Sequence, residues 1–284
     1  MKVSLVGSSG FFGTVFARGW KSNGLDLSEF NRNHMPWEQN GALTREFRSS
    51  EHIIWAATSL NPILAESKPD LVEKELMEWE SMLNQLSDSP ELKSFIFLSS
   101  GGCVYTDNDG PFDENMNADG INKYGEMKAN QEKSLLCAIP SSTVLRFSNL
   151  YGIGQPHGRG QGVIAEWAHA ISSGMPLNIY GDIEASRDFL HIRDAVRAVE
   201  NLLVRPAGGI YNVGSGTSAS LGEILALFKK YAKKPFNVDH KPGRSFDRKH
   251  YKLSIEKFQN RTSWSPSVTL VEGISEILRQ VTTN

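Results

Sequence analysis

Tyr124 and Lys128 lie four residues apart in the polar run that starts at Asn122, about 25 residues after the apolar segment 95–100. If this run is helical, the spacing puts the phenol and the ammonium on one face of the helix. A nearby cation lowers the pKa of a phenol and can hold it as a proton donor or acceptor. Such a pair often arises by chance, but here a dinucleotide-binding signal at the start of the chain accompanies it. We therefore expect Tyr124 and Lys128 to be catalytic.

The signal at the start of the chain is a short apolar run, 3–6, followed by a glycine-rich loop. In such a loop the first glycine permits a tight turn, the second lets the backbone approach a pyrophosphate, and the third allows close helix packing. Residues that give a helix one face to lay on a sheet come next, namely Phe12, Val15, Phe16, Gly19 and Trp20. The alternative is an ordinary glycine-rich turn, which the flanking strand and helix patterns disfavour. The loop residues that we expect to contact the cofactor are Gly7, Ser9, Gly10, Phe11, Phe12 and Gly13.

Composition narrows the class of protein. The 284 residues include 30 Lys plus Arg against 32 Asp plus Glu, a balance that argues against nucleic-acid or membrane-surface binding. Cys103 and Cys137 have no spacing typical of a metal site or a disulfide framework, and the seven histidines show no metal-ligand spacing. No apolar run is long enough to span a bilayer, and the early strand leaves no room for a signal peptide. We expect a cytoplasmic protein without a bound metal.

Apolar strand-like runs alternate with helical patterns along the chain. The clearest strands are expected at 3–6, 53–57, 95–98, 144–147 and 210–213, and the clearest helices at 71–86, 120–137 and 163–171. This alternation predicts an α/β fold, a Rossmann doubly wound parallel sheet with a smaller C-terminal substrate-binding lobe. We expect the NAD(P)-binding domain to comprise 1–150 with return segments near 188–216, and the smaller lobe to comprise 151–187 and 217–284.

The motifs taken together resemble a known family. The chain is similar to extended short-chain dehydrogenase/reductases of the sugar-nucleotide epimerase/dehydratase/reductase type. The motifs that carry the resemblance are the glycine loop, Trp55-Ala-Ala57, Ser99-Ser100, Val104-Tyr105, the Tyr124–Lys128 pair, Leu145 to Gly152, Ile179 to Asp182, Arg187 to His191, Asp194, Tyr211 to Gly216 and Trp264 to Pro266. Their order and spacing make the resemblance specific.

The resemblance implies a Rossmann cofactor lobe and a second lobe that holds a nucleoside-diphosphate sugar. Tyr124 would bond the reacting sugar oxygen, Lys128 would bind the nicotinamide ribose, and Ala56 and Ala57 would contact the cofactor. A phenol must be tuned below its ordinary pKa to act near neutral pH, and Lys128 and an oxidised nicotinamide would both lower it. Family members are often dimers through a helical face, so a homodimer is one expectation.

One departure from the family pattern concerns the cofactor. The family usually carries an acidic residue at the end of the second strand, where it accepts from the ribose 2′-hydroxyl. Asn31 and Arg32 stand in the corresponding run here. They remove a charge that would repel a 2′-phosphate and offer a guanidinium to bind it, which favours NADP(H) and leaves NAD(H) as the alternative. In the other interpretation Arg32 is a solvated loop residue that stacks on adenine.

Two further departures concern the catalytic loop and the adenine side. The family usually has a serine or threonine three residues before the valine of Val104-Tyr105, and Gly101 stands there, which cannot donate a hydrogen bond from a side chain. Ser100 is the expected substitute, with Cys103 a weaker donor. In addition, the stretch between Arg32 and Ile53 is short, and we expect it to lack the usual strand near the adenine.

Substrate contacts are implied by the resemblance only. The residues at the corresponding positions are Asn149, Asn178, Tyr180, Arg187 and Arg244. Arginine suits a diphosphate because its planar donors pair with phosphate oxygens. The alternative for Arg187 is a structural ion pair with Asp182 or Asp188.

These observations predict an NADP(H)-dependent reductase of a nucleotide-activated 4-keto sugar, often 6-deoxy, with Tyr124 as the proton donor. The first alternative is an NAD-retaining nucleotide-sugar 4-epimerase. A dehydratase is disfavoured because Gly102 and Cys103 stand where such enzymes usually carry Asp and Glu. A non-catalytic NADP-binding regulatory protein is the alternative that Gly101 suggests.

Overall fold

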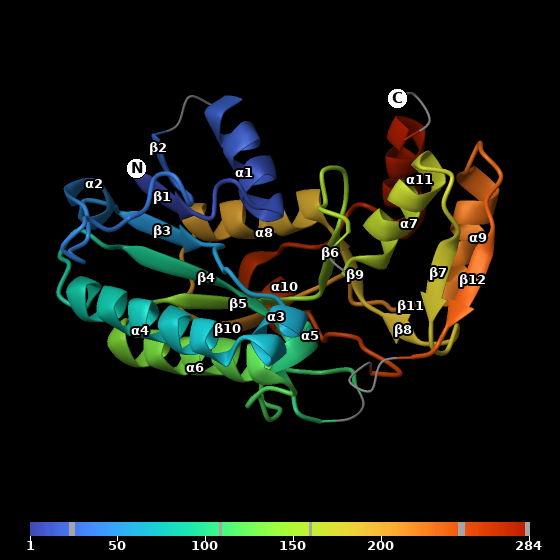
Figure 1. The fold of residues 1–284 in the computed structure, drawn as a ribbon. Coiled ribbons are helices and arrows are strands. Elements are labelled where there is room, and N and C mark those ends of the chain that lie inside the picture. The colour runs from blue at the N-terminus through green and yellow to red at the C-terminus, as the bar shows by residue number, and fades with distance from the viewer. Residues whose placement is uncertain (23–25, 108–109, 159–160, 244–247, 282–284) are drawn as a thin grey trace.

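The computed structural model describes residues 1–22, 26–107, 110–158, 161–243 and 248–281 (Figure 1). Its centre is a six-stranded sheet in which every pairing is parallel, in the order β10-β5-β4-β3-β1-β2. The strands are β1 (Val3–Val6), β2 (Leu27–Phe30), β3 (His52–Trp55), β4 (Ser94–Ser100), β5 (Thr143–Phe147) and β10 (Gly209–Val213). All five strands expected from the apolar runs are present, and the predicted fold class is confirmed.

Helices cover both faces of this sheet (Figure 1). One face carries α1 (Phe11–Ser22) and α8 (Ile192–Val204), and the other carries α4 (Pro69–Leu86) and α6 (Lys123–Ala138). The predicted apolar face of α1 is buried, with Phe12 stacked on Phe16 at 5.8 Å between ring centroids and Phe16 on Trp20 at 5.2 Å. Each helix layer thus buries its own apolar cluster against the sheet.

One edge of the sheet is β2, and the family resemblance implies that the adenine of the cofactor would lie near this edge. Residues 33–51 are all described and form only short bridges, Asn31 with His34 and Trp37 with Leu43, and one turn of helix, α2 (Arg45–Arg48). Within the described residues no strand pairs with the outer edge of β2. The expected lack of a strand here is confirmed.

A smaller lobe lies beside the sheet (Figure 1). It contains α7 (Val163–Ser172), α9 (Leu221–Tyr231) and α11 (Leu270–Val281) packed with the parallel pair β7 (Leu177–Tyr180) and β12 (Val238–Lys241). Its apolar cluster is separate from the two beneath the sheet. The remaining short elements are α3 (Pro62–Ser67), α5 (Gly101–Val104), β6 (Asn149–Tyr151), β8 (Ser186–Arg187), β9 (Phe189–His191), β11 (Ala219–Ser220) and α10 (Glu256–Thr262). The expected domain boundaries stay a prediction.

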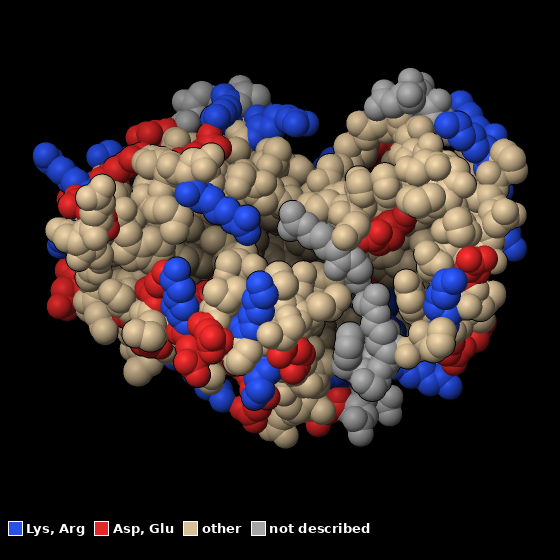
Figure 2. Space-filling model, viewed as in Figure 1, with Lys and Arg blue, Asp and Glu red and all other residues tan. Residues whose placement is uncertain are grey.

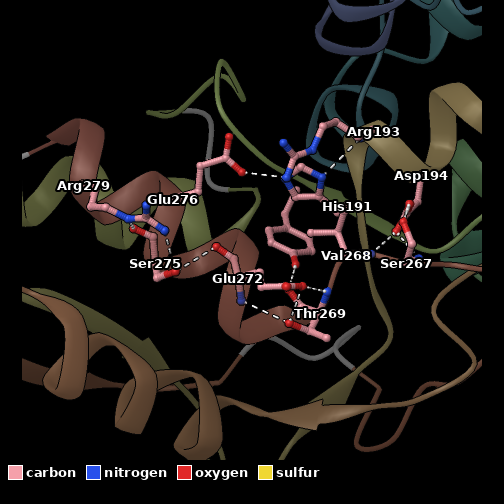
Figure 3. Close-up of polar contacts among 11 residues, drawn as sticks. His191, Arg193, Asp194, Ser267, Val268, Thr269, Glu272, Ser275, Glu276 and Arg279 are labelled. Atoms are coloured by element: carbon pink, nitrogen blue, oxygen red, sulfur yellow. Dashed lines mark hydrogen bonds and ion pairs between the residues drawn. The ribbon is translucent and has the colours of Figure 1, made fainter.

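Asp194 on α8 ties the sheet side of the molecule to the segment that leads into α11 (Figure 3). Its buried carboxylate accepts bonds from the backbone N–H groups of Ser267 and Val268, both at 2.9 Å, and from Arg197 at 2.6 Å. A buried carboxylate with this many donors is well compensated. Asp194 therefore has a structural role in fixing the smaller lobe. No helix in the described ranges is long and apolar enough to cross a membrane.

Candidate active site

A cavity of about 1100 Å³ separates the sheet from the smaller lobe, and Figure 2 shows the surface hollowed there. Phe11, Phe12 and Ala56 line it on the sheet side. Four of the five residues predicted to bind substrate line it on the other, namely Asn149, Asn178, Tyr180 and Arg187. The fold thus places the loop at the start of the chain opposite the smaller lobe.

The glycine loop is shaped by close backbone contacts. Gly7 has φ +95°, and a Cβ there would lie 2.8 Å from the Ala56 carbonyl carbon. A Cβ on Gly13 would lie 2.2 Å from the Gly7 carbonyl oxygen. Both positions therefore exclude a side chain, and the N-terminus of α1 comes close to the ends of β1 and β3. In a doubly wound sheet this crevice, where the strand order reverses, is the place where a dinucleotide fits.

Asn31 and Arg32 follow β2 beside this loop. The Asn31 side chain donates to the Ser8 hydroxyl at 3.2 Å and accepts from the backbone N–H of Asn33 at 2.9 Å and of His34 at 3.3 Å. Asn31 therefore fixes the turn against the glycine loop, a structural role that the sequence did not reveal. Arg32 is exposed and has no hydrogen bond or ion pair within the described residues. Its guanidinium is available to a ligand at the loop.

Tyr124 and Lys128, the predicted catalytic pair, lie at the start of α6, and the helix that their four-residue spacing predicts is present. Asn122 caps the helix by accepting from the Gly125 backbone N–H at 2.8 Å. A Cβ on Gly125 would lie 2.0 Å from the Cys103 carbonyl oxygen, so only glycine lets α6 dock against α5. Tyr124 and Lys128 both line the cavity.

Burial dominates the electrostatics of the pair. The Lys128 Nζ lies 4.6 Å from the Phe97 ring centroid and 5.8 Å from that of Tyr124. Burial lowers the pKa of Lys128, and the carboxylates of Glu75 and Glu132 oppose that effect. Burial also raises the pKa of Tyr124, as do the nearby Cys103 thiol and Glu75 carboxylate. This direction is opposite to the one expected from the Tyr-Lys spacing, because desolvation of the phenol is the largest influence on its pKa.

Glu75 on α4 supports the wall of the cavity by holding Thr58, and the sequence analysis missed it. Its carboxylate accepts from the Thr58 hydroxyl at 2.8 Å, the Ser59 hydroxyl at 2.7 Å and the Ser59 backbone N–H at 3.0 Å. It thereby holds the loop after β3, and it acts on the charge of Lys128. A signal was available: Glu75 stands four residues before Trp79, on the stripe of α4 that is otherwise apolar and buried.

The segment after β4 contains Gly101, at the position where the family usually has a serine or threonine. Ser100 lines the cavity, and burial raises the pKa of the Cys103 thiol while the neighbouring Ser100 and Asn122 side chains lower it. A Cβ on Gly101 would meet the Tyr251 hydroxyl at 2.8 Å and the Leu253 Cδ1 at 2.9 Å. The space of the usual serine or threonine is thus filled from a distant segment of the chain, which a local motif cannot reveal.

The predicted substrate residues differ in their surroundings. The Asn149 side-chain amide donates to the Asp188 carbonyl at 3.1 Å, and the Arg187 guanidinium donates to the Ser186 carbonyl at 2.9 Å. The Asp188 carboxylate, one of the two ion-pair partners considered for Arg187, accepts two hydrogen bonds from Ser215. The donors are the backbone N–H and the hydroxyl of Ser215, each at 2.8 Å. The Asn178 carbonyl accepts from a buried tryptophan, and Tyr180 is 43% exposed. The fifth predicted residue, Arg244, lies outside the described residues.

Comparisons with known proteins agree with this geometry. Residues 3–214 match the model of the NAD dependent epimerase/dehydratase family. The dTDP-4-dehydro-6-deoxyglucose reductase of Escherichia coli is 31% identical over 194 residues, 66% of this chain and 61% of the reductase, so the match spans less than two thirds of that relative. The UDP-glucose 4-epimerase of Mycolicibacterium smegmatis is 26% identical over 97% of both chains. The solved structure of a UDP-glucose 4-epimerase of Thermus thermophilus in complex with NAD has a TM-score of 0.85 and 25% identity over 99% of each chain.

Proposed function

Because the chain belongs to the NAD dependent epimerase/dehydratase family, we propose that it is an NADP(H)-dependent reductase of a nucleotide-activated 4-keto sugar, with a 6-deoxy sugar favoured. The observation that carries the proposal is Arg32, exposed beside the glycine loop where the family usually has a carboxylate. Glu29, the acidic residue within β2, is paired with Lys21. A 2′-phosphate would therefore meet a guanidinium and no unpaired carboxylate of β2. The dTDP-4-dehydro-6-deoxyglucose reductase similarity supports the same class of reaction.

The residues of the cavity fit a nicotinamide dinucleotide. The glycine loop excludes the side chains that would block a pyrophosphate, and α1 presents its N-terminus there. When bound, the nicotinamide supplies hydride chemistry at the keto carbon. Lys128 would bind the ribose and keep the phenol of Tyr124 in place.

Tyr124 is the proposed proton donor to the keto oxygen. Burial raises the pKa of its phenol, so the side chain holds its proton until charge develops on the sugar oxygen. A reductase needs the protonated phenol at the start of each turnover, and this electrostatic environment provides it. Replacing Tyr124 by phenylalanine would remove the proton and abolish turnover, whereas a purely regulatory NADP-binding protein would be unaffected.

A second candidate is an NAD-retaining UDP-sugar 4-epimerase. The observation in its favour is the match to the Mycolicibacterium smegmatis epimerase over 97% of both chains. The two candidates differ in how they use the cofactor, because a reductase releases the oxidised dinucleotide after each turnover and an epimerase regenerates it in place.

The experiment that tests the proposal measures the cofactor. Purified protein is denatured and any released dinucleotide is identified by mass spectrometry, and binding is titrated with NADPH and NADH. We expect a site that is largely empty and prefers NADPH, and Arg32→Ala should weaken NADPH about 10-fold or more without changing NADH affinity, since charge-assisted hydrogen bonds contribute about 1.5–3 kcal/mol. Arg18→Ala, an exposed arginine on α1, is the matched control. NAD released in near-equal amount to protein would favour the epimerase.

A further inference from the structure

Tyr251 comes from the far end of the chain and lies against the catalytic loop. Its backbone N–H donates to the Ser186 carbonyl at 3.1 Å, and its ring stacks on Phe112 at 5.8 Å between centroids. The residue is 2% exposed, yet it lines the same cavity as Tyr124. The ring is therefore held firmly in the wall of this cavity.

The hydroxyl of Tyr251 has no hydrogen-bond partner within the described part of the chain. A buried hydroxyl without a partner is costly, so a structure that keeps one calls for an explanation. Ser100, the expected substitute, also lines the cavity, but it is only half-buried. Tyr251 is thus a buried donor beside Gly101 whose hydrogen bond is still to be made.

Gly101 and Tyr251 fit each other. A Cβ at position 101 would lie 2.8 Å from the Tyr251 hydroxyl, closer than real Cβ contacts. Leu253, which is fully buried, would be 2.9 Å away and leaves little room for Tyr251 to retreat. The absence of a side chain at position 101 therefore makes room for the phenol, and the phenol occupies the volume of the side chain that the family usually places there.

We propose that the Tyr251 hydroxyl donates the second hydrogen bond to the reacting oxygen of the nucleotide sugar, in place of a side chain at position 101. This inference rests on the proposed function, since the reacting oxygen belongs to the nucleotide sugar. Tyr124 gives up its proton, and Tyr251 stabilises the developing negative charge without giving up its own. Burial raises the pKa of Tyr251, which keeps the hydroxyl protonated as a donor.

The test is Tyr251→Phe, measured with NADPH and dTDP-4-dehydro-6-deoxyglucose. We expect kcat to fall roughly 10–100-fold, somewhat less than for loss of a full oxyanion donor, while the affinity for NADPH and the thermal midpoint stay near those of the wild type. Tyr211→Phe is the matched control, because Tyr211 is also buried but donates to the Gly208 carbonyl at 3.1 Å and does not line the cavity. Unchanged kcat in Tyr251→Phe, or a loss matched by Tyr211→Phe, overturns the inference.

A second pair of variants tests the fit at position 101. Gly101→Ser alone should lower both the thermal midpoint and kcat, because the new side chain meets the Tyr251 hydroxyl. Gly101→Ser combined with Tyr251→Phe should recover part of both, since the contact with the Tyr251 hydroxyl is removed while that with Leu253 stays, and a hydroxyl is restored to the loop. If the losses of kcat and thermal midpoint in the double variant equalled the sum of those in the two single variants, the proposed replacement of a side chain at position 101 by the Tyr251 hydroxyl would be contradicted.

Failure of the proposed function is distinguishable from failure of this inference. The wild type is assayed for ketosugar reduction and for interconversion of UDP-glucose and UDP-galactose. If it epimerises and does not reduce, the reductase proposal fails, and Tyr251→Phe must then slow epimerisation by the same factor. If neither reaction occurs, calorimetric titration with UDP-glucose in the presence of NADP⁺ replaces kcat, and unchanged affinity in Tyr251→Phe overturns the inference.

Discussion

Replacing Gly125 by alanine is expected to displace Tyr124 and nearly stop turnover. The new Cβ would lie 2.0 Å from the Cys103 carbonyl oxygen, whereas ordinary contacts begin near 3.4 Å, so α6 must move away from α5 by about 1.4 Å. Tyr124 directly precedes Gly125, and a misplacement of about 1 Å at a reacting group can cost about 100-fold in rate. Overpacking should also lower the free energy of unfolding by about 1–3 kcal/mol, offset in part by the better helix propensity of alanine.

The measurements are kcat with NADPH and a nucleotide 4-ketosugar, and the urea midpoint. Gly19→Ala is the matched control, because Gly19 also lies inside a helix, α1, but a Cβ there has nothing within 4 Å. That variant should keep full activity and gain up to about 1 kcal/mol in stability. If Gly125→Ala turned over at the wild-type rate, the argument that close docking of α6 on α5 positions Tyr124 would be wrong.

Three other predictions concern buried groups. Glu132→Gln should lower the free energy of unfolding by about 3 kcal/mol, because the buried Arg146 guanidinium, 2.6 Å from Glu132, loses its charge partner. The control Lys133→Gln breaks an exposed ion pair and should change the free energy of unfolding little. Equal losses in the two variants would refute the stabilising role of the buried pair. Burial lowers the pKa of His52 below 6.5, so the unfolded chain binds a proton first as pH falls and stability should decline below about pH 6.5. His52→Gln should make that decline shallower in denaturation series at several pH values, and an identical slope would contradict it. Burial raises the pKa of Tyr124, so its tyrosinate absorbance should appear only above about pH 10. That absorbance is the difference between pH titrations of the wild type and of Tyr124→Phe. A difference that titrates at lower pH would contradict the raised pKa of Tyr124.

The sheet and its glycine loop were predictable because their signals are local. Buried parallel strands read as continuous apolar runs, and 3–6 and 144–147 need no other part of the chain to be recognised. Gly10 and Gly13 lie against the Gly7 carbonyl a few residues away, whereas Gly7 itself lies against Ala56 of a distant segment. The short stretch between Arg32 and Ile53 likewise predicted that the family's usual strand near the adenine would be lacking, because the stretch is short by comparison with the family pattern.

The candidate site was predictable where its residues lie within sequence motifs. Tyr124 and Lys128 share a helix, so their spacing sufficed. The contact of Tyr251 with Gly101 joins segments 150 residues apart, and no local pattern specifies it. The raised pKa of Tyr124 was missed for the same reason, since desolvation depends on everything packed around the phenol.

The most direct test of the account is a turnover measurement with the wild-type protein. NADPH and dTDP-4-dehydro-6-deoxyglucose are mixed with the enzyme, and oxidation of the nicotinamide is followed together with the sugar product. We expect one NADPH to be consumed for each ketosugar reduced, and the reaction with NADH to be slower. Interconversion of UDP-glucose and UDP-galactose without net oxidation of a nicotinamide would contradict it.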